Sequence, residues 1–206
     1  PPELARRESG ALERARKDLA DDLKIRSALQ FAFYEQWRAL RRYCSERRIR
    51  VVGDVAIFVN YDSADVWIHR DLFRLNENLE SEVVSGVPPD FFSKTGQRWG
   101  NPLYRWDVMK ERGYPWWIQR LRWATQNSDY IRLDHFRGFE AYWSVPADAK
   151  TARSGQWIIG PGLDFFHAVR TAMPEAKLIA EDLRLLTPAT LAFREATGLP
   201  GMAVLQ

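Results

Sequence analysis

The chain has 206 residues and a formal net charge of +3, and 46% of its residues are hydrophobic, which excludes an intrinsically disordered protein. Its single cysteine, Cys44, excludes a disulfide framework, and its three widely spaced histidines provide no zinc-ligand pattern. No apolar run has membrane-spanning length, and no signal-peptide pattern is recognised. We therefore expect a cytoplasmic protein with no membrane partner.

The positive charge is confined to the first part of the chain. Residues 1–50 carry 13 Lys or Arg against 8 Asp or Glu, whereas the other 156 residues carry 17 against 19. In the first part both signs are interleaved, which is typical of a solvent-exposed helix with i,i+4 charge pairs. Without a motif or a stripe of one sign, we expect no nucleic-acid partner.

Helical periodicity marks residues 11–48. Phe33, Trp37, Leu40 and Cys44 recur at spacings of four, three and four residues. This spacing predicts one apolar stripe along a helix, with Cys44 in the core.

Residues 51–59 form an apolar run rich in β-branched and aromatic side chains. Such a run predicts a strand buried on both faces, as in a parallel sheet. Asp54 is the exception, because it places a carboxylate inside the run.

Residues 87–106 contain three prolines and two glycines and show neither helical nor strand periodicity. They predict a loop, and a loop of about 20 residues inside a compact domain is more often functional than idle. Beyond it, Pro115 suits the first position of a helix, and residues 129–136 predict a second strand.

The alternation continues to the end of the sequence. It predicts a loop at residues 155–163, a helix at residues 164–172 and a third strand at residues 177–181. The next predicted helix runs from Pro188 to about Thr197, with Thr187 as its N-cap and Gly198 after it. Residues 202–206 predict a fourth strand. Strands that alternate with helices predict parallel βα units. Because three and a half units cannot close an eight-stranded barrel, we expect a segment of one.

Two carboxylates, Asp134 and Glu181, stand at the carboxyl ends of successive predicted strands. In βα folds this edge carries the chemistry, and paired carboxylates there suit glycoside cleavage. Arg132 lies two residues before Asp134, on the same face of the strand, where it can keep that carboxylate ionised. Periodicity alone leaves open that these acids are only caps or ion pairs.

Nine tryptophans are the unusual feature of the composition. Their large faces serve ordinary cores, and they also suit the C–H faces of sugar rings. Composition favours the core and leaves sugar binding open.

Four motifs add a family resemblance: GDVAIFVNYDSADVW, VPPDFFSKTGQRWGNPLYRWDVM, IRLDHFRGFEAYW and LIAEDL. Over about Gln30 to Gln206 the chain resembles the 4-α-glucanotransferases called amylomaltases or disproportionating enzymes, of the α-amylase-like clan. The resemblance implies a partial (β/α)8 TIM barrel, about strands 3 to 6, with a long inserted loop. It also implies a retaining double displacement that needs no metal or other cofactor.

The resemblance also implies roles for individual residues. Asp134 of the DHFRG motif is the expected nucleophile, and Glu181 of the AED motif is the expected general acid/base. The expected substrate-binding residues are Asp54, Asp90, Phe92, Gln97, Trp99, Arg132 and His135. The expected substrates are α-1,4-glucans, or maltooligosaccharides, whose segments pass to the 4-hydroxyl of an acceptor glucan or glucose.

Two departures from the family pattern are visible. Arg184 stands where the family usually has glycine, and the third carboxylate, in a His-Asp pair after a later strand, is absent. We therefore expect residues 1–206 to be an internal segment of a catalytic domain, with residues 1–29 as a helical lead-in, and to be inactive alone. A non-catalytic α-glucan-binding protein is the alternative.

Overall fold

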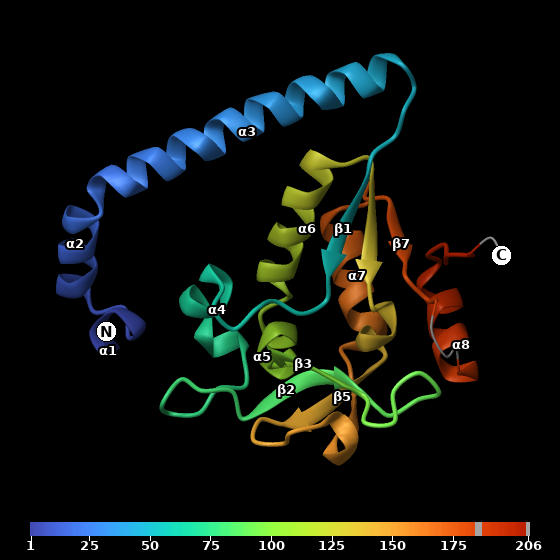
Figure 1. Cartoon of the computed structure of the whole chain (residues 1–206). Coiled ribbons are helices and arrows are strands. Elements are labelled where there is room, and N and C mark those ends of the chain that lie inside the picture. The colour runs from blue at the N-terminus through green and yellow to red at the C-terminus, as the bar shows by residue number, and fades with distance from the viewer. Residues whose placement is uncertain (184–186, 205–206) are drawn as a thin grey trace. The chain divides into compact units, whose positions relative to one another are not determined.

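The first part of the chain, Pro1–Val51, forms a unit of its own that consists of helices. These helices are α1 (Pro2–Ala5), α2 (Ser9–Asp18) and α3 (Ala20–Glu46), as Figure 1 shows. The predicted helix at residues 11–48 is confirmed apart from a break at Leu19. The predicted core position of Cys44 is wrong, because α3 buries none of its residues and Cys44 is only half-buried.

A parallel sheet lies at the centre of the second unit, Val52–Gln206. In this computed structural model, which describes residues 1–183 and 187–204, its strands are β1 (Val52–Ala56), β4 (Tyr130–Asp134) and β7 (Leu178–Ala180), in the order β1-β4-β7. All pairs are parallel, so the first three predicted strands are confirmed. The predicted burial on both faces is wrong for β1, because Val52, Asp54 and Ala56 are exposed. The fourth is wrong over residues 202–204, which form no strand, and Leu205, Gln206 and Arg184 lie outside the described residues.

A second, antiparallel sheet was not predicted. It contains β2 (Val83–Val87), β3 (Gln97–Pro102), β5 (Ala141–Pro146) and β6 (Gln156–Ile159), in the order β3-β2-β5-β6. The loops predicted at residues 87–106 and 155–163 are therefore wrong where they include β3 and β6. The residues of β3 and β6 do not alternate between apolar and polar. These two strands form because β2 and β5 offer them backbone hydrogen-bond partners.

The described residues thus form two open sheets, and the expected barrel segment is confirmed only as parallel βα units. In Figure 1 the antiparallel sheet lies beyond the arrowheads of β1 and β4. One contact between these two regions joins Trp99 of β3 to His135, the residue after β4.

The helices of this unit share an aromatic-rich core with the parallel strands. They are α4 (Ala64–Ile68), α5 (Trp106–Glu111), α6 (Pro115–Asn127), α7 (Gly162–Ala172) and α8 (Pro188–Thr197), with the 3-10 turns η1 (Arg70–Leu72), η2 (Phe136–Phe139) and η3 (Ala152–Ser154). Trp117, Phe139 and Phe165 are completely buried at the centre. For these helices the sequence predicts the starts well: Pro115 opens α6, and the Thr187 hydroxyl caps α8 by accepting from Thr190 N.

Within residues 1–183 and 187–204, no helix combines the length and the apolar composition that crossing a membrane requires.

Candidate active site

Strands β1 and β4 bring together an arginine and two carboxylates. Asp54 of β1 is the register partner of Arg132 of β4. Arg132 Nη2 lies 2.9 Å from Asp54 Oδ2 and 2.9 Å from Asp134 Oδ1, so one nitrogen bridges both acids. The hydrogen bond to Asp54, with the charges of Asp54, Asp134 and Glu181, raises the pKa of Arg132. This cation therefore stays charged and holds Asp134 in place.

Glu181 follows β7 directly and is held by main-chain groups. Its Oε2 accepts a hydrogen bond from His135 N at 3.0 Å, and its Oε1 accepts one from Leu183 N at 3.2 Å. Its own N donates to Leu133 O at 3.1 Å, which continues the pairing of β4 with β7. Asp134 and Glu181 thus occupy neighbouring strand ends.

His135 makes the turn that joins these two acids. Its backbone is left-handed, with φ 51° and ψ 48°, an uncommon conformation for a residue with a side chain. The turn aims His135 N at Glu181 immediately after Asp134. The His135 ring is buried and meets Trp99 edge to face, with centroids 4.9 Å apart.

Asp134 and Glu181 differ in what holds them. A side-chain cation contacts Asp134, whereas main-chain N–H groups contact Glu181. The two carboxylates at these neighbouring strand ends therefore lie in different environments.

A cavity of about 430 Å³ lies beside this cluster. It is lined by Val87, Pro88, Pro89, Asp90, Phe91, Phe92, Gln97, His135, Arg137, Trp157 and Leu183. Four residues that the sequence predicts for substrate binding, Asp90, Phe92, Gln97 and His135, are therefore neighbours. Trp99 reaches the same region through its contact with His135 and through a hydrogen bond from its Nε1 to Gln97 Oε1 at 3.1 Å.

The loop between β2 and β3 presents aromatic rings to solvent. Phe91 and Phe92 are 96% and 91% exposed. Asp90 shapes this loop, because its Oδ1 accepts from Phe92 N at 2.9 Å and from Ser93 N at 2.7 Å. Exposed rings at a cavity with little polar lining suit the apolar faces of a sugar chain.

Arg137 and Trp157 are among the lining residues that sequence reasoning did not single out. The guanidinium carbon of Arg137 lies 4.0 Å from the centroid of the Trp157 ring, a cation–π contact. Trp157 had a signal, since it belongs to the unusual set of nine tryptophans, but its assigned loop gave no reason to place it here. Among residues 1–183 and 187–204, no group of histidine, cysteine or acidic side chains is arranged to hold a metal ion.

Comparison with known proteins gives concordant matches. A family model described as 4-alpha-glucanotransferase, Glyco_hydro_77, matches residues 1–206. The chain is 47% identical over 206 residues to a 4-alpha-glucanotransferase of Thermus thermophilus, and 43% identical to a chloroplastic/amyloplastic 4-alpha-glucanotransferase of Arabidopsis thaliana. It is covered completely in both, but spans only 41% and 36% of these relatives.

Solved structures match as well. The fold superposes on an amylomaltase from Streptococcus agalactiae in complex with acarbose with a TM-score of 0.96 and 37% identity, over 99% of this chain and 41% of that one. An amylomaltase from Corynebacterium glutamicum matches with a TM-score of 0.67 at 23% identity, over 81% of this chain and 23% of that one, a likeness of fold alone.

Proposed function

Since the chain belongs to the 4-alpha-glucanotransferase family, we propose that it carries the nucleophile and the general acid/base of an enzyme that transfers α-1,4-glucan segments to the 4-hydroxyl of an acceptor glucan or glucose. The observation that carries this proposal is the placement of Asp134 and Glu181 on neighbouring ends of parallel strands, with Arg132 on Asp134.

In the first step Asp134 attacks the anomeric carbon of the donor. Its Oδ1 contacts Arg132, so Oδ2 is the oxygen that we expect to form the bond. Glu181 protonates the departing glycosidic oxygen as the bond to the anomeric carbon breaks. The products are a glycosyl ester on Asp134 and the released reducing-end sugar.

In the second step an acceptor replaces the released sugar. Glu181, now a carboxylate, removes the proton of the acceptor 4-hydroxyl, whose oxygen displaces Asp134 from the anomeric carbon. The two inversions restore the α-configuration.

Transfer is faster than hydrolysis only where an acceptor sugar, and not water, reaches the glycosyl ester. The cavity beside the two acids is suited to this task, because Phe91, Phe92 and Trp157 offer apolar faces on which glucose rings can stack. The acarbose bound by the Streptococcus agalactiae relative supports a glucan ligand here. Asp54, Asp90, Gln97 and Trp99 are the proposed polar and aromatic contacts.

Asp134→Asn and Glu181→Gln, made in the natural protein that contains this chain, test the proposal. With maltotriose, the unchanged protein should release glucose and build longer maltodextrins. Each variant should lose at least about 100-fold in rate, the size of a general acid–base contribution. The control is Asp71→Asn, which removes an exposed acid paired with Arg112 and should leave the rate unchanged. A protein that binds maltotriose and turns over none would be a glucan-binding protein instead.

A further inference from the structure

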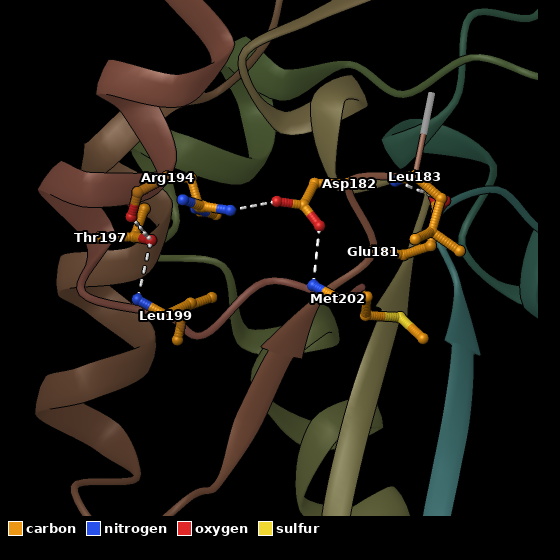
Figure 2. Close-up of polar contacts among 7 residues, drawn as sticks. All are labelled: Glu181, Asp182, Leu183, Arg194, Thr197, Leu199 and Met202. Atoms are coloured by element: carbon orange, nitrogen blue, oxygen red, sulfur yellow. Dashed lines mark hydrogen bonds and ion pairs between the residues drawn. The ribbon is translucent and has the colours of Figure 1, made fainter. Parts of the chain in front are cut away.

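Asp182, the residue after Glu181, has a buried carboxylate. Its side chain is only 2% exposed. In Figure 2 it points away from Glu181, toward α8. Burying a carboxylate is costly unless a cation or hydrogen-bond donors compensate it. Arg194 of α8 supplies the cation through Nη1, and Met202 N donates to Asp182 Oδ1 at 2.8 Å.

The chain around Asp182 is fitted to this contact. Pro200 O accepts from Ala180 N at 2.8 Å, which draws the segment after α8 alongside β7. A Cβ at Gly201 would lie 2.4 Å from both Asp182 Oδ2 and Arg194 Nη1. A side chain at this position would therefore have to displace the ion pair. We call Asp182, Arg194, Gly201 and Met202 the Asp182 clamp.

The helix that provides Arg194 is also fixed to the segment after Asp134. Phe193 of α8 stacks on Phe136, with ring centroids 5.2 Å apart. Thr190 Oγ1 of the same helix donates to Glu140 Oε2 at 3.2 Å. Through α8, Asp182 is therefore tied to the turn that follows the nucleophile strand.

We propose that Asp182 is a positioning residue for Glu181. This inference rests on the proposed function and extends it. One of the two main-chain donors to Glu181 is Leu183 N, the group immediately after Asp182. When the Asp182 clamp is intact, Leu183 N stays within hydrogen-bond reach of Glu181 Oε1. When it is broken, Leu183 N moves and Glu181 is misplaced for proton transfer.

The test separates proton transfer from all other steps. Asp182→Asn, in the natural protein that contains this chain, should lower kcat with maltotriose about 10- to 100-fold, the cost of misplacing a reacting group by about 1 Å. KM should stay within about twofold, because misplacing an acid/base affects the transition state more than substrate binding.

A second substrate pair bypasses Glu181. With α-maltotriosyl fluoride as donor and azide as acceptor, fluoride departs from the anomeric carbon without protonation as Asp134 bonds to it. Azide then displaces Asp134 without a base and gives the glycosyl azide. On this pair Asp182→Asn should match the unchanged protein within about twofold, whereas general structural damage would lower both rates. Equal losses on both pairs, or no loss on maltotriose, would overturn the proposal.

Three further variants make the result decisive. Glu181→Ala should lose turnover of maltotriose and keep the fluoride and azide reaction; if it loses both, the proposed function itself fails. Should Asp182→Asn not fold, the neutral pair of Asp182→Asn with Arg194→Gln carries the test, because it buries no unpaired charge. Asp71→Asn, in an exposed acid–arginine pair, is the matched control and should change neither rate.

Discussion

The aromatic core makes a quantitative prediction for Phe165→Ala. The Phe165 ring is completely buried among four other aromatic rings. The distances between its centroid and theirs are 4.8 Å for Phe139, 5.1 Å for Phe166, 5.4 Å for Tyr114 and 5.5 Å for Trp117. Returning a buried phenylalanine to water costs about 1.5–3 kcal/mol. The lost ring pairs and the cavity that remains raise the cost of such a truncation to about 3–5 kcal/mol.

Urea unfolding followed by tryptophan fluorescence measures this loss. Of the nine tryptophans only Trp37 lies in Pro1–Val51, so the signal reports the unit that contains Phe165. A loss of about 4 kcal/mol at a slope of about 2 kcal/mol per molar urea lowers the midpoint by about 2 M. Domains are stabilised by only about 5–15 kcal/mol, so the variant should lose at least about a quarter of its free energy of unfolding.

Phe92→Ala is the matched control, because it makes the same truncation at a ring that is 91% exposed. It should shift the free energy of unfolding by less than about 0.5 kcal/mol. Since Phe92 lines the cavity, the same variant should raise KM for maltotriose in the natural protein. Equal destabilisation by Phe165→Ala and Phe92→Ala would refute the assignment of Phe165 to the core.

Two further predictions concern Arg132 and Thr187. Arg132→Met should lower kcat/KM at least about tenfold, because this cation bridges Asp54 and Asp134. A hydrogen bond to a charged group contributes about 1.5 kcal/mol or more, which corresponds to about this factor. Unchanged steady-state kinetics would contradict the bridge. Thr187→Ala should cost about 1 kcal/mol in urea unfolding, since its hydroxyl caps α8; Thr187→Ser should restore most of it, and a failure to do so would count against the cap.

The parallel strands were predictable because their sequences carry the reason for their structure. The apolar run at residues 51–59 contains β1, and the predicted strands at residues 129–136 and 177–181 contain β4 and β7. The runs predict the strands correctly, but not their burial: β4 and β7 alternate buried with half-buried residues, and in β1 only Val55 is buried. Helix starts were equally readable where local chemistry decides, as with Pro115 at the start of α6.

The antiparallel sheet was not predictable because its strands depend on their partners. β3 (QRWGNP) contains glycine and proline and has no alternation, yet it pairs with β2 through a register shift. β6 (QWII) is only four residues long and pairs with β5. Here backbone hydrogen bonding to a neighbour overrides weak local preference.

The same distinction applies to the site. The placement of Arg132 on the face of Asp134 followed from alternation within one strand, and the contact is present. The contact between Arg132 and Asp54 required the register of β1 against β4, which single-strand patterns do not contain. For Asp90 the resemblance implied substrate binding, whereas the structure adds a local function, the turn that its Oδ1 holds.

The proposed double displacement would make different demands on the two carboxylates. As the proposed nucleophile, Asp134 would use only one oxygen for the bond to sugar, and its other oxygen, Oδ1, contacts Arg132. Glu181 would have to lose a proton and regain it, and the groups that hydrogen-bond to its carboxylate are main-chain N–H groups rather than a side-chain cation. Main-chain N–H groups carry no net charge, so they can orient Glu181 in both steps. Their positions depend on the chain on either side of Glu181, so the role that we propose for the buried ion pair at Asp182 is to hold one of these donors, Leu183 N, in place.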